Sequence, residues 1–324
     1  MSLPTPDVVI VIVNFNSGPL LARCLTALAA QTFRKFEVVV LDNASTDDST
    51  SVATAIAAFP ARLIHAPTNL GFAAGANRAL REAGPTPWVA LLNPDAFPEP
   101  EWLQELTEAA ARYPDCASFA SCQIMANRQD LLDGTGDAYH TSGLAWRAGH
   151  GRPVPVDPEM ECEVFSACAA AALYRRDVFD ALGGLDEDFF CYMEDVDLGF
   201  RLRLAGWRCM YVPTAVVHHV GSATSGRRSH FTIYHGHRNL VWVYLKNMPG
   251  VLLWLYLPLH LLLNLIECCA FVARGQGRTI LTAKLDAVRG LPRMWRKRKQ
   301  VQAMRKCTVA DILRAMQHGW PRRM

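Results

Sequence analysis

Three carboxylates lie within four residues near the middle of the chain, at positions 194–197 (Glu-Asp-Val-Asp). An aromatic, apolar run from Phe189 to Tyr192 precedes them, and a helical pattern follows. Acidic side chains at a helix start are favoured by the helix dipole, so a solvated helix terminus is one interpretation. A carboxylate at the mouth of a pocket can also act as a general base, which is the other interpretation. The rest of the chain has to decide between them.

A second group of polar residues stands where predicted strands end. Residues 8–13 and 88–92 are continuous apolar runs and residues 36–41 are apolar except for Glu37, as expected for strands buried on both faces of a sheet. In open α/β sheets, ligands bind at the carboxyl ends of the parallel strands. One such residue alone is commonly a turn former, so the prediction of a shared crevice rests on their coincidence. The strand-end residues are Asn14, Asn16, Asp42, Asn43, Asn93 and Asp95.

The elements that must position these side chains alternate along the first 95 residues. Helical patterns over 19–30 and from residue 71 onward separate the apolar runs, and residues 62–65 form a further short strand. This order predicts an α/β fold with a mostly parallel sheet and helices on both faces. Residues 126–160 are rich in Gly, Pro and charge, and are predicted to form long loops.

Two common phosphate cradles are missing from the sequence. No Gly-x-Gly-x-x-Gly follows the first strand and no Gly-x-x-x-x-Gly-Lys-Ser/Thr occurs, which argues against an oxidoreductase on a dinucleotide fold and against P-loop phosphoryl transfer. A divalent cation that bridges Asp95 to phosphate oxygens is the natural alternative. Asn93 and Asp95 flank Pro94, so one carboxylate and one amide could face such a metal.

The ten cysteines show no metal-type spacing and no Cys-x-x-Cys. They indicate small core residues or free thiols of a reducing compartment rather than a disulfide framework. The N-terminus has no basic region, and its apolar run covers only six residues. A secretory signal is therefore not expected, and the first half should fold in the cytosol.

The end of the chain differs from its body in hydropathy and charge. Residues 251–274 form an apolar stretch that would reach roughly 30–35 Å as a helix, enough to span a bilayer. Residues 275–324 hold 13 of the 33 Lys and Arg residues but only two acids, Asp286 and Asp311. A single crossing would put this basic tail opposite a cytosolic body, against the positive-inside tendency.

We therefore expect a helix or helical hairpin on the inner face of the membrane, with the basic tail on anionic head groups. A buried helical pair of a soluble protein is the alternative. Nucleic acid is not an expected partner, because Trp295 is the only aromatic platform in the basic run.

Taken together, the motifs resemble the inverting family 2 glycosyltransferases with a GT-A fold, and most closely their rhamnosyltransferase-like bacterial branch. The resemblance covers about residues 8–300, and the motifs occur in the family order. They are Val13-Asn14-Phe15-Asn16, Asp42-Asn43-Ala44-Ser45, the stretch 69–77, Asn93-Pro94-Asp95-Ala96, Glu194-Asp195-Val196-Asp197 and Val217-His218-His219.

The resemblance implies a set of donor-binding residues. Asn14 and Asn16 would lie near the base and ribose, and Asp42 would accept hydrogen bonds from the nucleobase with Asn43 beside it. Asn93 stands in place of the first Asp of the Asp-x-Asp metal motif. The remaining implied donor-binding residues are Gly71 and Asn77 in the nucleotide pocket and Arg238 near the diphosphate or the membrane face.

The resemblance also implies the catalytic and metal-binding residues. Asp195 would be the general base, Glu194 would orient the acceptor, and Asp197 would be structural, paired with Arg201 four residues on. Asp95 and His219, rather than His218, would bind a divalent cation, Mn²⁺ or Mg²⁺.

The predicted function is transfer of a sugar with inversion, from a nucleotide donor to a glycan or polyprenyl-diphosphate-linked acceptor in cell-surface polysaccharide synthesis. The branch suggests rhamnose from dTDP-rhamnose. The alternative is a membrane-associated nucleotide-sugar-binding protein without turnover.

The predicted organisation is a GT-A domain over 1–240, with a nucleotide half (1–97) and an acceptor half (98–240), then a membrane-associated region over 241–324. The expected location is the cytoplasmic side of the membrane, peripheral or re-entrant.

Overall fold

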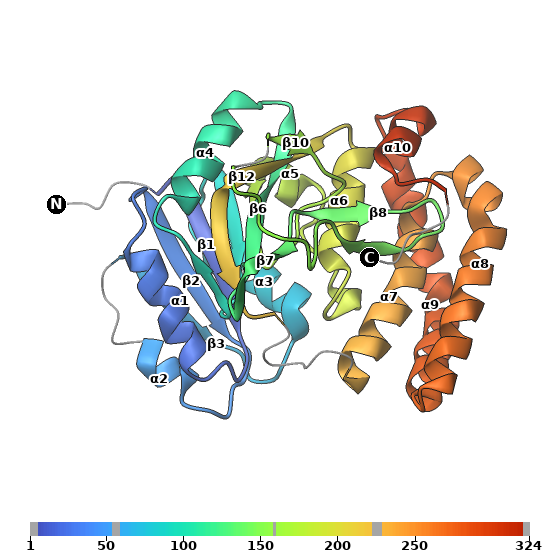
Figure 1. Ribbon diagram of the computed structural model, residues 1–324, viewed down its shortest axis with the longest axis horizontal. Coiled ribbons are helices and arrows are strands. Elements are labelled where there is room, and N and C mark those ends of the chain that lie inside the picture. The colour runs from blue at the N-terminus through green and yellow to red at the C-terminus, as the bar shows by residue number, and fades with distance from the viewer. Residues whose placement is uncertain (1–5, 54–58, 158–159, 222–228, 320–324) are drawn as a thin grey trace.

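The first half of the chain forms the parallel part of a large sheet (Figure 1). The computed structural model describes residues 6–53, 59–157, 160–221 and 229–319. Strands β1 (Val8–Asn14), β2 (Phe36–Asp42), β3 (Ala61–His65) and β4 (Trp88–Leu92) lie parallel, as predicted. Asn14 pairs with Asp42 in register, and Asp42 pairs with His65. The polar strand ends therefore share one edge of the sheet.

The second half of the chain extends this sheet and introduces antiparallel strands. The order is β10-β12-β6-β11-β4-β1-β2-β3, with β5 paired to β12 and β7 paired to β6. β11 runs antiparallel between β4 and β6, whereas β12 runs parallel to β6. The bounds are β5 (Ala96–Pro98), β6 (Cys116–Met125), β10 (Cys162–Glu163), β11 (Ala171–Arg175) and β12 (Arg208–His219).

The prediction of long loops over residues 126–160 is wrong. This region contains β7 (Arg128–Gly134), β8 (Asp137–Tyr139) and β9 (Ala145–Arg147). β7 returns along β6, while β8 and β9 form a separate two-stranded ribbon. The strands are short and rich in turn formers, so pairing with partner strands decides their conformation rather than local propensity.

Helices cover both faces of the sheet, because alternate residues of its strands are apolar on both sides. Ile10 and Ile12 of β1 pack with α1 (Pro19–Ala29) and α4 (Trp102–Arg112) on one face. Val9 and Val11 pack with the helices of the other face. Those helices are α3 (Gly71–Glu82), α5 (Arg176–Ala181) and α6 (Glu194–Leu204). The short α2 (Ser49–Ala53) and η1 (Glu187–Phe189) lie in connections.

Four C-terminal helices stand together at one end of the molecule (Figure 1). They are α7 (His230–Asn247), α8 (Gly250–Ala273), α9 (Gly277–Ala303) and α10 (Val309–Ala315). A separate apolar cluster joins Phe200 of α6 to Trp242 of α7, Leu253 of α8 and Met294 of α9. The predicted domain division at residue 240 lies inside α7 and stays a prediction.

Candidate functional site

Hydrogen bonds connect the polar side chains at the ends of β1 and β2. Asn14 is fully buried, and its amide nitrogen donates to Asp42 Oδ1 at 3.1 Å and to Ser49 Oγ at 2.9 Å. Asp42 is 5% exposed and also contacts His65 Nδ1 at 3.3 Å. Because neighbouring polar groups hold both carboxylate oxygens, the orientation of Asp42 at the sheet edge is fixed. Asn16 has φ 47° and accepts a hydrogen bond from the Thr46 N–H, so it lies at the same edge.

Asn43 connects this edge to the start of α3. Its side chain donates to Asn69 Oδ1 and the Gly71 carbonyl and accepts from the Leu70 N–H. Gly71 has φ 81°, and a Cβ there would lie 2.5 Å from the carbonyl oxygen of Phe190. The residue must therefore be glycine, since the segment that precedes the carboxylates passes directly over it.

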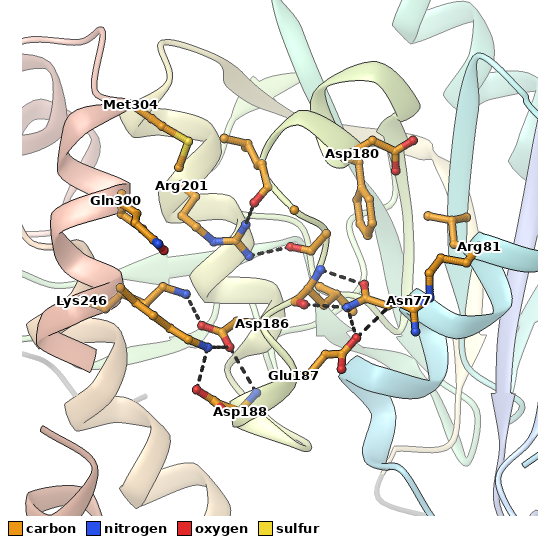
Figure 2. Close-up of a pocket in the computed structure, with 18 of the residues that line it drawn as sticks. Asn77, Arg81, Asp180, Asp186, Glu187, Asp188, Arg201, Lys246, Gln300 and Met304 are labelled. Carbon is orange, nitrogen blue, oxygen red and sulfur yellow. Dashed lines mark hydrogen bonds and ion pairs between the residues drawn. The ribbon is translucent and has the colours of Figure 1, made fainter. Parts of the chain in front are cut away.

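Asn77 lies on the far side of the same helix from this contact. Its side chain donates to the Leu185 carbonyl at 2.8 Å and accepts from the Leu185 N–H at 3.0 Å. Figure 2 shows it in the wall of a cavity of about 490 Å³, together with Asp186, Glu187 and Lys246. These contacts attach α3 to the segment before the carboxylates. The predicted donor contact of Asn77 stays a prediction.

The turn after β4 brings Asp95 beside His219. β5 pairs antiparallel with the end of β12, where His219 is opposite Ala96. His219 is 2% exposed, and its Nε2 lies 3.3 Å from Asp95 Oδ1 without a hydrogen bond to any described residue. His218 points elsewhere and contacts Glu99 Oε1 at 3.0 Å. The half-buried Asn93 is held in the turn through its backbone N–H, which donates to Ala170.

The pair Asp95 and His219 suits a divalent cation. The buried Nε2 of His219 faces the carboxylate of Asp95 at 3.3 Å, and both are groups that can bind a divalent cation. In the described ranges, no group of three or more His, Cys, Asp or Glu side chains is arranged to hold a metal ion. Further ligands would have to be phosphate oxygens and water, as is common for Mg²⁺.

Asp133 and Arg147 join this pair, although no motif or spacing in the chain singled them out. Asp133, at the end of β7, accepts a hydrogen bond from His219 Nδ1 at 2.7 Å and pairs with Arg147. Burial raises the pKa of Asp133, but the His219 hydrogen bond and the Arg147 charge outweigh it and lower that pKa to about 2. The ionised Asp133 fixes the ring so that Nε2 faces Asp95.

Asp195 stands at the start of α6, partly exposed. Its Oδ2 accepts a hydrogen bond from the Ala169 N–H at 3.1 Å, and its Oδ1 accepts from the Val196 N–H. The next carbonyl, that of Ala170, accepts from the Asn93 N–H at 2.9 Å. Two adjacent residues thus connect the carboxylate of Asp195 to the turn that carries Asp95.

Two further carboxyls near Asp195 have raised pKa values. Glu194 is 5% exposed, and burial together with the charge of Asp195 raises its pKa well above the ordinary value. Burial and the same charge raise the pKa of Asp137, which accepts a hydrogen bond from Ser166 Oγ. The buried Glu194 and Asp137 thus have environments unlike that of the partly exposed Asp195, and neighbouring carboxyls in different environments take different roles.

Asp197 has the structural role predicted for it. It is fully buried and accepts from Arg201 Nε at 2.8 Å, the residue four positions on. The side chain of Arg238 is also held by other residues of the protein. Its guanidinium donates to the Phe189 carbonyl at 2.9 Å and lies 4.3 Å from the Trp242 ring centre. The predicted contact of Arg238 with the donor stays a prediction.

Comparisons with known proteins agree with this geometry. The profile of the family "Glycosyl transferase family 2" matches residues 9–183. The N-acetylglucosaminyl-diphospho-decaprenol L-rhamnosyltransferase of Mycobacterium tuberculosis is 32% identical over 251 residues, which are 70% of this chain and 80% of that protein. The O-antigen chain rhamnosyltransferase of Salmonella anatum is 24% identical over 66% of each chain.

A solved structure supports the fold assignment. The mannosyltransferase PcManGT from Pyrobaculum calidifontis, in complex with GDP-Man and Mn²⁺, superposes with a TM-score of 0.56. The match covers 96% of this chain and 87% of that chain at 20% identity, a likeness that shows the fold. The mostly parallel sheet and the solved structure show that the chain has the GT-A fold. The family match and the relatives show that it belongs to glycosyltransferase family 2.

Proposed function

We propose that this glycosyltransferase transfers rhamnose from dTDP-rhamnose to a polyprenyl-diphosphate-linked sugar, with inversion and with a divalent cation. The observation that carries the proposal is the link between Asp195 and the Asp95 turn through Ala169 and Ala170. A base and a diphosphate site held on one rigid connection can act on the two sides of one anomeric carbon.

The chemical step follows from the positions of the carboxyls. Asp195 takes the proton of the acceptor hydroxyl as that oxygen forms a bond to the anomeric carbon. The bond from the anomeric carbon to the nucleoside diphosphate breaks at the same time, and the single displacement inverts the centre. Glu194, whose pKa is raised and one of whose carboxyl oxygens makes no hydrogen bond to a described residue, holds the acceptor beside the base.

The diphosphate leaves with negative charge, which a cation held at the Asp95 turn would balance. Asp95 and His219 would hold Mn²⁺ or Mg²⁺, which when bound neutralises the leaving diphosphate. Asp133 keeps the His219 ring in place through the 2.7 Å hydrogen bond to Nδ1. Asn14, Asp42 and Asn43 provide the polar edge for the nucleoside.

The donor and acceptor classes come from the relatives. The mycobacterial relative is an L-rhamnosyltransferase whose name gives N-acetylglucosaminyl-diphospho-decaprenol, and the Salmonella relative is an O-antigen chain rhamnosyltransferase. We carry rhamnose and a lipid-linked diphosphate sugar to this chain on that basis. The intact Asp95, Asp195 and His219 favour turnover over the alternative of donor binding alone.

A lipid-linked acceptor requires a membrane surface, and α8 and α9 supply a suitable face. Within the described residues, α8 is the one helix whose length and composition would allow a membrane span. Its exposed apolar side chains include Trp254, Leu255 and Leu265. On α9, the exposed Leu281, Leu285, Val288 and Trp295 recur at a spacing that puts them on one side of the helix. Exposed Arg278, Arg289, Arg296 and Lys299 accompany this apolar stripe.

The polar residues of α8 turn inward, which supports a helix lying in the membrane plane. His260 is 3% exposed, its Nδ1 contacts the Ser142 carbonyl at 2.7 Å, and its ring stacks on Tyr244 at 3.9 Å. Asn264 and Glu267 also face protein groups, Lys284 and His237 respectively. If α8 crossed the bilayer, its midpoint would take the β8–β9 connection about 15 Å deep into hydrocarbon. We therefore propose peripheral, in-plane attachment at the cytoplasmic surface.

Replacing the base tests the reaction. Asp195→Asn should keep dTDP-rhamnose affinity but lower the transfer rate by about 10²–10⁴-fold, because the amide cannot accept the hydroxyl proton. The measurement is transfer of labelled rhamnose to N-acetylglucosaminyl-diphospho-polyprenol, with Asp115→Asn, an exposed carboxylate, as the control. Near wild-type turnover in Asp195→Asn would remove this residue as base; a wild-type protein that binds donor without turnover would support the binding-protein alternative.

Replacing Glu194, the neighbour of Asp195, should leave the transfer rate almost unchanged. Because burial and the charge of Asp195 raise the pKa of Glu194 well above its usual range, the neutral amide in Glu194→Gln should keep the transfer rate within about threefold. The raised folded-state pKa stabilises wild type most below the ordinary carboxyl pKa, and this contribution is lost as pH rises through the folded-state pKa. Glu194→Gln should therefore gain stability relative to wild type as pH rises above the ordinary carboxyl range, measured by urea unfolding. Loss of transfer equal to that of Asp195→Asn would contradict the neutral role.

The metal site can be tested by binding alone. Wild type should bind dTDP at least about tenfold more tightly with Mn²⁺ than with chelator, because the cation bridges protein and diphosphate. Asp95→Ala should abolish this metal-dependent increment in calorimetry, whereas Asp130→Ala, on the exposed part of β7, should not. An unchanged increment in Asp95→Ala would show that Asp95 is not a ligand.

The attachment surface can be tested with vesicles. Leu255→Lys combined with Leu265→Lys should lower binding to anionic vesicles by about 100-fold or more, since two apolar side chains no longer enter the interface. Val156→Lys, which changes a fully exposed valine on another surface, should bind as wild type does. Alkaline carbonate should release the wild-type protein from membranes. Retention after carbonate would indicate a spanning α8 instead.

A further inference from the structure

The segment before the base has an unusual backbone. Phe190, Tyr192 and Met193 have φ values of 64°, 68° and 70°, in the left-handed region that non-glycine residues avoid. Met193 directly precedes Glu194, so these dihedrals set the direction in which α6 and Asp195 leave the turn. Such conformations persist only where the surroundings hold them.

One side chain of α7 holds most of this backbone. Asn239 is fully buried, and its amide nitrogen contacts the carbonyls of Phe189 at 2.9 Å, Cys191 at 3.0 Å and Tyr192 at 2.7 Å. Its own Oδ1 accepts from Arg238 Nε at 2.9 Å, which fixes the amide orientation. The left-handed turn therefore has its carbonyls gathered around a single donor group.

Charges from the C-terminal helices hold the two ends of the same segment. Lys246 of α7 contacts Asp186 at 2.5 Å, before the turn, and Asp197 at 2.9 Å, after it. Lys297 of α9 contacts Asp186 and Asp188. Figure 2 shows Asp186, Asp188 and Lys246 close together. On its other side the turn touches the nucleotide edge, where the Ala73 N–H donates to the Phe190 carbonyl at 3.2 Å.

We propose that Asn239 is a positioning residue for Asp195, and that α7 completes the catalytic site rather than serving only the membrane attachment. The amide holds the 189–193 turn in its left-handed form, and the turn aims the base at the acceptor. This inference rests on the proposed transfer reaction. Donor affinity is not expected to depend on Asn239, because its hydrogen bonds go to the 189–193 turn and to Arg238.

The test compares two buried amides that bond to backbone carbonyls. Asn239→Ala should lower kcat for transfer by about 100-fold, the cost expected for a misplaced catalytic group, with dTDP-rhamnose affinity unchanged. The control is Gln31→Ala, since the fully buried Gln31 donates to the Glu99 carbonyl at 2.7 Å, between α1 and α4. It should lose stability but keep kcat.

A double variant separates positioning from general destabilisation. In an Asp195→Asn background, Asn239→Ala should cause little further loss, because residues that act through one group are not additive. A full further loss, or a kcat unchanged in Asn239→Ala alone, would overturn the proposal. If Asn239→Ala does not fold, Asn239→Ser, which keeps a hydroxyl donor, is measured with the same outcomes. Absence of transfer by wild type would instead count against the proposed function itself.

Discussion

The fully buried carboxylate of Asp197 is the constraint on which the site depends. A charge without solvent must have partners, and this one has three: Arg201 Nε at 2.8 Å, Lys246 Nζ at 2.9 Å and Asn247 Nδ2 at 2.8 Å. Two of them come from α7, so α6 and α7 cannot separate without leaving buried charge unpaired. Asp195 lies two residues before Asp197 in the same helix, so its position is fixed as well.

The nucleotide edge is connected to the same point. Hydrogen bonds run from the Asn93 N–H through residues 170 and 169 to Asp195, and from the Ala73 N–H to the turn at Phe190. Asp195, the proposed base, is thus held against the sheet and against the C-terminal helices at once. Catalytic groups on such a rigid frame need little rearrangement when substrates bind, which is how proximity contributes most to rate.

The sequence predicted those parts that local pattern determines. β1, β2 and β4 follow from apolar runs, and the Asp197–Arg201 pair follows from helical spacing. The Asp133–His219 contact joins residues 86 positions apart, within a region whose composition indicated loops, so no local signal existed. The left-handed turn was equally hidden, because Phe190, Tyr192 and Met193 are residue types that favour other dihedrals.

Helix α8 shows that hydropathy averaged along a helix does not reveal how its polar residues are distributed around it. His260, Asn264 and Glu267 interrupt α8 in sequence, yet in three dimensions all three face α7, α9 or the catalytic body, and the opposite side stays apolar. Under in-plane attachment, one side of this helical layer faces lipid and the other faces the 189–193 turn. Only the thickness of the helices, about 10 Å each, separates the two sides. A lipid-linked acceptor would then approach Asp195 from a direction that the helices fix. One layer of helices thereby determines both where the acceptor comes from and where the base points.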